Sequence, residues 1–158
     1  MAEAEVASAA LNVQRVYLKD LSLELPNAPQ IFLEQSQAQF NMEIDTTANK
    51  LSPEVWEVTV SATVTTKVGD KVAFLVEAKQ AGIFEIRGIP DEQMPIVLEV
   101  TCPNIVFPYL SANIGDVVSR TGFPPMSLPI GFFDMRFQRK MEEAAAAQAG
   151  SAGILLPN

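Results

Sequence analysis

The stretch EVWEVTVSATVTTKV, residues 54–68, decides the fold class of this chain. Its even-numbered positions are mostly apolar, whereas its odd-numbered positions are mostly polar. An alternation with a period of two is typical of a β-strand with one buried face and one face in solvent. We therefore predict a long strand here, whose buried face carries Trp56, Val58, Val60, Ala62, Val64 and Val68.

The segment that follows predicts a β-hairpin. Val68-Gly69-Asp70-Lys71 is typical of a hairpin turn, because glycine tolerates the positive φ that such turns need. The next strand is expected from Lys71 to about Gln80, and Gly82 is predicted to mark a bulge or bend after it. One face of this strand carries Val72, Phe74, Val76 and Ala78.

Two further strands are predicted upstream. Residues 40–45 alternate apolar Phe40, Met42 and Ile44 with polar side chains. A first strand should run from Leu11 to Leu25 and end at the breaker PNAP, residues 26–29. Its apolar side is expected to carry Tyr17, Leu21, Leu23 and Leu25, and its polar side Asp20, Ser22 and Glu24.

From Pro90 onward the pattern becomes helical. The segment PDE, residues 90–92, places proline and two acids where a helix begins. A second helix is expected from about Asn104 to Arg120, and a third from about Phe132 to Ala147, each with an apolar stripe. Strands followed by helices indicate an α+β protein rather than a chain of βαβ units.

A chain of 158 residues suits one domain with a real core. We expect a flexible N-terminus over residues 1–10, a single α+β domain over residues 11–147 and a disordered tail over residues 148–158. A strand of about fourteen residues spans about 48 Å, so this sheet has more apolar surface than the predicted helices cover. We therefore expect subunits to associate and cover the rest.

The composition argues against an enzyme. The chain has no histidine, which is the commonest general base and metal ligand, and it has a single cysteine, Cys102. The sequence also contains no glycine-rich phosphate-binding motif. We expect no catalytic residues, no metal ligands and no cofactor, and a buried structural role for Cys102. A small enzyme or ligand carrier with an apolar pocket between sheet and helices is the competing interpretation.

The charge and the cysteine count point to a compartment and a kind of partner. A net charge of -8 disfavours nucleic acids and favours basic proteins. A lone cysteine suits a reducing compartment, and the start of the chain lacks the positive charges of a signal peptide. No apolar run approaches the roughly 20 residues of a membrane helix. These features predict a cytoplasmic protein with no direct membrane insertion.

Two surfaces are candidates for binding other polypeptides. Strand parity predicts a polar sheet face that carries Asp20, Glu24, Glu43, Asp45, Glu57, Leu75 and Glu77. Such a face suits a basic partner, and it equally suits a plain solvated surface. Phe40, Phe74, Phe133 and Phe137 would converge where the sheet meets the last helix, either as ordinary core or as a groove for extended apolar segments.

Several runs of sequence resemble SecB, the bacterial protein-export chaperone family. They are RVYLKD at residues 15–20, PNAP at 26–29, AGIF at 81–84, CPNIVFPY at 102–109, VSR at 118–120 and GFP at 122–124. The similarity extends from about Leu11 to Phe137 in a single register, and the run CPNIVFPY is highly specific.

The resemblance implies a four-stranded antiparallel sheet with helices on one side, assembled as a homotetramer that is a dimer of dimers. It also implies an ATP-independent holdase, which keeps preproteins unfolded in the cytoplasm and delivers them to SecA, the motor ATPase of the export channel. No cofactor is implied. A SecB-fold chaperone dedicated to a specific client, such as an antitoxin, is the alternative.

The resemblance also implies site residues. The SecA-binding positions are Asp20, Glu24, Leu75 and Glu77, and the client-binding groove contains Phe40, Met42, Ile44, Phe74 and Phe137. Two features depart from the family pattern. Ser36 stands where the family usually carries a tryptophan, and residues 150–158 are neutral where the family often has a basic or mixed-charge end.

Overall fold

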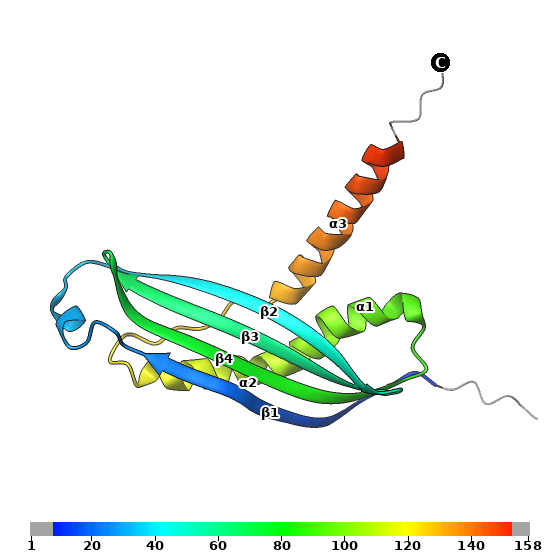
Figure 1. Cartoon of the computed structure of the whole chain (residues 1–158), viewed down its shortest axis with the longest axis horizontal. Helices are drawn as coiled ribbons and strands as arrows, with labels where there is room; N and C mark the ends of the chain where they lie inside the picture. The colour runs from blue at the N-terminus through cyan, green and yellow to red at the C-terminus, as the bar shows by residue number, and fades with distance from the viewer. Residues whose placement is uncertain (1–7, 153–158) are drawn as a thin grey trace, which may run out of the picture. The chain divides into compact units, whose positions relative to one another are not determined.

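The computed structural model describes residues 8–152 and contains a four-stranded antiparallel sheet (Figure 1). The strands are β1 (Ala10–Glu24), β2 (Ala38–Ser52), β3 (Val55–Val68) and β4 (Lys71–Arg87), in the spatial order β1-β4-β3-β2. The turn between β3 and β4 contains Gly69 with a φ of 62°. The predicted α+β class, the long antiparallel sheet and the hairpin are therefore confirmed.

The alternation of residues 54–68 distinguishes the two faces of the sheet. On β3, Val58, Val60 and Val64 are fully buried. On β4, Val76 and Ala78 are buried beside them, opposite Val64 and Ala62. We call this the inner face of the sheet and the opposite one the outer face.

Helix α2 (Cys102–Ser119) covers the inner face and packs mainly against β4 and β3 (Figure 1). Its buried residues include Cys102, Val106, Leu110, Ile114 and Val118, which are spaced four apart. Side chains at this spacing form one stripe along a helix, so burial against the sheet fixes which side of α2 faces inward.

The helical path into α2 is continuous, whereas the sequence predicted two separate helices, one beginning at residues 90–92 and the next at about Asn104. A 3₁₀ turn, η2 (Asp91–Gln93), leads into α1 (Met94–Ile96) and a π-helical turn, η3 (Val97–Thr101). The wider π turn ends at Thr101, two residues before Pro103, which lacks an N–H for the regular helical ladder. By length and composition alone the segment Asp91–Ser119 is apolar enough to cross a membrane, which differs from the expectation above. Its stripe is buried against the sheet, as in a core helix.

Bulges alter the predicted alternation of two strands. The register of β1 with β4 shifts between Leu18 and Asp20, so Lys19 is an extra residue. Tyr17 consequently lies opposite Ala81 on the outer face, rather than on the predicted side with Leu21.

A second shift, between Thr66 and Lys67, corrects the prediction for Val72. Val72 pairs with Lys67, whereas Phe74 pairs with Thr66, because Ala73 is an additional residue in β4. Val72 is therefore not in line with Phe74 and Val76, as the simple alternation predicted.

The predicted bulge at Gly82 does not occur in β4 itself. Strand β4 has no extra residue here and keeps a regular register with β3; the nearest register shift lies in β1, where Gln14 is an extra residue opposite Ile83 and Phe84. A Cβ atom at position 82 would lie 2.6 Å from Cε2 of Phe84 and 3.1 Å from Cγ2 of Val106 on α2. Glycine is needed here because a ring and a helix pack directly onto the backbone.

The described residues form two compact units, one that ends at Leu128 and one that begins at Pro129. The second unit contains α3 (Phe132–Ala152), which extends beyond the predicted end at Ala147. Residues 1–7 and 153–158 lie outside the described residues, and with them most of the predicted flexible N-terminus and part of the predicted tail. Of the rest, Ala10 belongs to β1 and residues 148–152 belong to α3.

Candidate functional site

The outer face of the sheet brings the predicted acidic residues together. Residues that pair across antiparallel strands point to the same face. Three successive rows cross β1, β4, β3 and β2 in that order: Asp20–Lys79–Ser61–Asp45, Ser22–Glu77–Thr63–Glu43 and Glu24–Leu75–Thr65–Asn41. We call these three rows the acidic face. It contains all four residues predicted for SecA binding.

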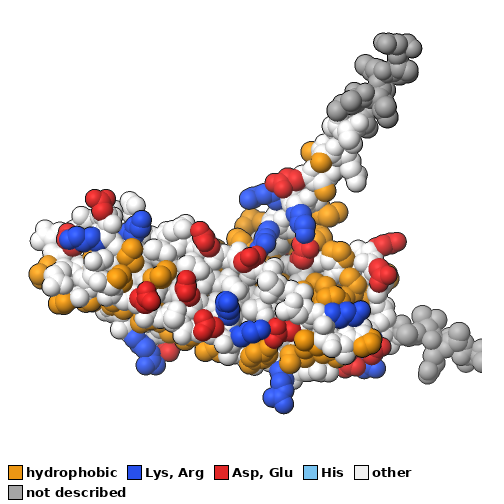
Figure 2. Space-filling view, viewed as in Figure 1, with side chains coloured by type: hydrophobic (Ala, Val, Ile, Leu, Met, Phe, Trp, Pro, Cys, Tyr) orange, Lys and Arg blue, Asp and Glu red, His pale blue; other side chains and the backbone are white. Residues whose placement is uncertain are grey.

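The carboxylates of the acidic face are open to solvent. Asp20, Glu24 and Glu77 are exposed, and Leu75 is half-buried among them. In the space-filling view, carboxylate side chains are spread over the sheet (Figure 2). None of these three carboxylates forms an ion pair within residues 8–152. A shallow hollow of about 240 Å³ is lined in part by Asp20 and Glu77, so a partner side chain can reach both strands.

Glu57 also lies on the outer face, but a local network engages it. The Tyr17 hydroxyl donates a hydrogen bond to Oε2 of Glu57, and Lys19 Nζ lies 2.9 Å from Oε1. The bond from Tyr17, followed by the one from Lys19, holds the pKa of Glu57 below its ordinary value. The same bond, with burial, raises the pKa of Tyr17 to about 12. The bulge at Lys19 brings Tyr17 to this face, where Tyr17 and Lys19 both bind the Glu57 carboxylate. Glu57 therefore differs from Asp20, Glu24 and Glu77, because its negative charge is balanced by Lys19 within the chain.

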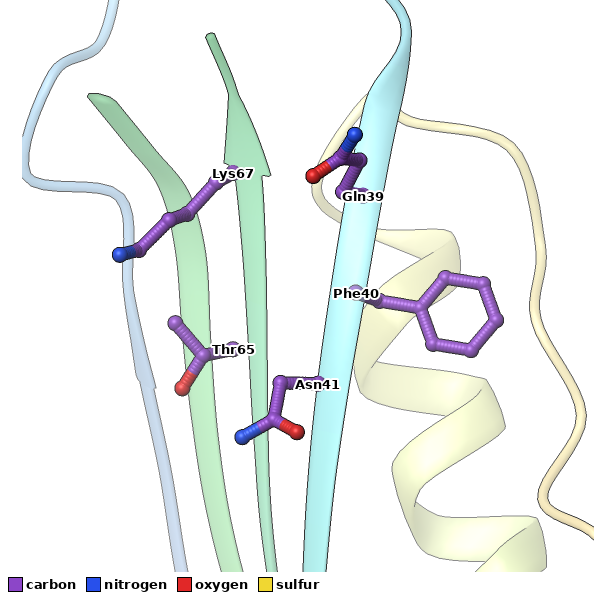
Figure 3. Close-up of a pocket in the computed structure, with 5 residues that line it drawn as sticks. All are labelled: Gln39, Phe40, Asn41, Thr65 and Lys67. Carbon is purple, nitrogen blue, oxygen red and sulfur yellow. The ribbon is translucent and has the colours of Figure 1, made fainter. Parts of the chain in front are cut away.

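An apolar hollow lies on the inner face, where β2, β3 and β4 meet the loop that follows α2. It has a volume of about 180 Å³ and is lined by Ala38, Phe40, Thr66, Phe74 and residues 123–126. The Phe40 side chain is 64% exposed, so one wall of the hollow is open. Its ring points to the opposite side of β2 from Gln39 and Asn41 (Figure 3).

The rings of Phe74 and Phe123 form the other wall, and Phe32, which does not line the hollow, stacks on Phe123. The Phe123 ring lies 5.6 Å from that of Phe74, centroid to centroid, and is stacked 5.2 Å from that of Phe32. Phe32 belongs to a 3₁₀ turn, η1 (Gln30–Leu33). The sequence prediction missed Phe32 and Phe123, although the run Gly122-Phe123-Pro124 marked the loop that carries one of them.

The remaining predicted groove residues differ in their placement. Met42 and Ile44 are half-buried on the same face of β2 as Phe40, opposite Val64 and Ala62, but they do not line the hollow. Phe137 is half-buried on α3, in the second compact unit. The predicted meeting of Phe133 and Phe137 with Phe40 and Phe74 stays a prediction.

Two side chains of the inner face have notable chemistry. Cys102 is fully buried, and burial raises the pKa of its thiol to about 12, which keeps it protonated. The Thr66 hydroxyl is buried beside the hollow and has no hydrogen-bond partner among the described residues. No group of three or more His, Cys, Asp or Glu side chains is arranged to hold a metal ion within residues 8–152.

Comparison with known proteins identifies the family. The family model described as preprotein translocase subunit SecB matches residues 4–144. The chain belongs to the SecB family. It is 54% identical over 142 residues to the protein-export protein SecB of Burkholderia multivorans, covering 90% of this chain and 89% of the relative. It is 56% identical over 151 residues to SecB of Ralstonia nicotianae, covering 93% and 87%.

The fold is also that of a solved SecB-like protein. A SecB-like chaperone of Mycobacterium tuberculosis, solved in complex with a peptide from an antitoxin, superposes with a TM-score of 0.62. The match covers 76% of this chain and 89% of that chain at 15% sequence identity, so it supports the fold alone. The resemblance noted in the sequence is therefore confirmed, both in family and in architecture.

Proposed function

We propose that this SecB protein binds unfolded preproteins in the cytoplasm without using ATP, keeps them competent for export and delivers them to SecA. Membership of the SecB family establishes a chaperone role in protein export. One observation supports the division of labour: the apolar hollow and the acidic face lie on opposite faces of one sheet. A client and a motor can therefore be bound at the same time.

The inner face suits the client. Extended, unfolded segments expose apolar and aromatic side chains, and the hollow offers Phe40 and Phe74 with the ring of Phe123 behind them. We propose that Met42 and Ile44 continue this surface along β2 and that Phe137 adds to it from α3. Many weak contacts along a chain give useful affinity without sequence specificity.

The client role is tested by the refolding of a denatured precursor protein. The chaperone should slow refolding in the absence of ATP. Phe40→Ala should reduce the delay with little change in stability, because the ring is mostly exposed. Leu51→Ala is the matched control, since Leu51 is a similarly exposed apolar residue of β2 outside the hollow. If the wild-type protein causes no delay, the proposed client binding is wrong.

The outer face suits the motor. We propose that SecA docks on Asp20, Glu24, Leu75 and Glu77, with the carboxylates meeting basic side chains and Leu75 meeting an apolar one. Asp20→Lys and Glu77→Lys should each weaken SecA binding and leave the refolding delay intact. Asp70→Lys makes the same charge change in the exposed β3–β4 turn and should have little effect. Loss of client binding in the two face variants would mean that this face was assigned wrongly.

We also propose that the protein assembles as a homotetramer, a dimer of dimers. Strand β1 forms one edge of the sheet and exposes Val13 and Leu18 to about 45%, which favours a further subunit at this edge. Light scattering should give the mass of four chains. A stable monomer of 17.2 kDa would contradict the assembly.

The names of the relatives favour export over the dedicated-client alternative. Both relatives described above are named protein-export protein SecB, whereas the antitoxin peptide is bound by a protein only 15% identical to this one. Recovery of many different precursors with the purified protein would support the general role, and recovery of a single client would support the alternative.

A further inference from the structure

A polar hollow lies next to the acidic face, towards the turn between β3 and β4. It has a volume of about 470 Å³ and is lined by Gln39, Phe40, Asn41, Thr65 and Lys67. The side chains of Gln39, Asn41, Thr65 and Lys67 lie on the outer side of the strands, whereas the Phe40 ring points to the other side (Figure 3). Because Gln39 pairs with Lys67, the hollow adds a fourth row to the three rows of the acidic face.

Lys67 is separated from the acidic side chains of this region, whereas Lys79 lies opposite Asp20 in the first row of the acidic face. Lys19 and Lys71 form ion pairs with Glu57 and Glu34. The cross-strand neighbours of Lys67 are Gln39 and Val72, which are uncharged. Its ammonium group is exposed and has neither a carboxylate nor a hydrogen-bond partner in the part of the chain that the structure describes. The three rows of the acidic face therefore carry five carboxylates and one lysine, whereas the fourth row carries Lys67 and no carboxylate.

We infer that the Lys67 hollow binds a carboxylate carried by the same partner segment that docks on the acidic face. This inference rests on the proposed docking function of that face. The Lys67 ammonium only donates hydrogen bonds, the amides of Gln39 and Asn41 and the hydroxyl of Thr65 can donate as well as accept, and all four lie on one side of the two strands (Figure 3). A carboxylate accepts hydrogen bonds only, so it is the complementary ligand.

The spacing of the rows defines the pattern of the partner segment. Successive rows are about 6.8 Å apart, so Lys67 lies about 14 Å from the row of Glu77 and about 20 Å from that of Asp20. An extended partner chain has the same repeat. We therefore expect a partner segment with the matching side chains at every second position. Two basic side chains would meet Asp20 and Glu77, an apolar one would meet Leu75, and an acidic one would meet Lys67. On a face with carboxylates alone, a basic segment could bind equally well in several registers along the strands. The Lys67 row favours the one register that places the acidic side chain of the segment beside Lys67.

Two synthetic peptides test the inference in the full-length protein. The first is Arg-Ser-Arg-Ser-Leu-Ser-Glu, acetylated and amidated so that its glutamate is the sole carboxylate. The second replaces this glutamate by glutamine. A protein with a net charge of -8 attracts the second peptide more strongly by overall charge. The inference makes the opposite prediction, a twofold to fivefold tighter binding of the glutamate peptide at low ionic strength, which is the size expected for an exposed ion pair.

Matched variants locate the effect. Lys67→Gln should abolish the preference for the glutamate peptide, whereas Lys79→Gln removes the same charge beside Asp20 and should preserve it. Equal or tighter binding of the glutamine peptide by the wild-type protein would overturn the carboxylate site. If Asp20→Lys still weakens both peptides in that case, the docking face survives without the carboxylate site. If neither peptide binds, the docking face and the carboxylate site are both wrong.

Discussion

Gly82→Ala tests whether close packing explains the glycine in β4. The new Cβ would lie 2.6 Å from Cε2 and 2.8 Å from Cζ of Phe84, and 3.1 Å from Cγ2 of Val106. Phe84 and Val106 are both fully buried, so the ring can move only by disturbing the contact between β4 and α2. Overpacking of this kind costs about 1–3 kcal/mol, and the smaller backbone entropy of alanine returns about 0.4–1 kcal/mol. We expect a net loss of about 1–2 kcal/mol.

The assay is urea unfolding at fixed protein concentration, followed by the fluorescence of Trp56, the sole tryptophan of the chain. Gly115→Ala is the matched control, because no atom lies within 4 Å of a Cβ at this position in α2. It should raise the free energy of unfolding by up to about 1 kcal/mol.

A double variant tests whether the clash with the Phe84 ring causes the loss of stability in Gly82→Ala. Phe84→Leu removes the ring atoms that Gly82→Ala would strike, so the two changes together should cost less than the sum of their separate effects. If Gly82→Ala alone leaves the unfolding midpoint at or above that of the wild-type protein, the packing explanation of this glycine is refuted.

The other predictions concern polar groups. Tyr17→Phe should lower the free energy of unfolding near neutral pH by about 1.5 kcal/mol, because a hydrogen bond to charged Glu57 is lost. Since the pKa of Glu57 is lowered in the folded protein, its contribution exists above its ordinary pKa and disappears as the pH falls through the lowered value, so urea titrations of the two proteins should converge in acid. Thr66→Val should raise the unfolding free energy by about 1 kcal/mol, because a buried hydroxyl without a partner is removed; a loss of similar size would show that the hydroxyl is satisfied. Cys102 should react with a thiol reagent at pH 8 only as fast as the protein unfolds, and rapid labelling of the native protein would contradict its burial.

Regular alternation made much of the sheet predictable. The residues of β3 obey it from Val58 to Val68, so the strand, its buried face and the turn at Gly69 followed from the sequence. The acidic face was predicted for the same reason, since Asp20, Glu77 and their neighbours keep the parity of their strands.

The parts that could not be predicted depend on single residues. A bulge inserts one residue without changing the composition, so nothing local announced that Lys19 would turn Tyr17 to the other face. A glycine in a strand can mark a bend or leave room for a neighbouring side chain, and the sequence alone does not distinguish the two. At Gly82 the space is needed by the ring of Phe84. Phe123 joins the hollow through a contact with Phe74, far away in the chain, and no strand or helix period connects the two.

The strand order also has a consequence for synthesis of the protein on the ribosome. Strand β1 ends at Glu24, but its hydrogen-bonding partner β4 is complete only at Arg87. At about 5–20 residues per second, β1 waits on the order of 3–13 s for a partner, whereas β4 follows β3 at once. During this interval the nascent chaperone itself exposes a long unpaired strand. For a few seconds it is therefore an incompletely folded chain, like the polypeptides that a chaperone binds.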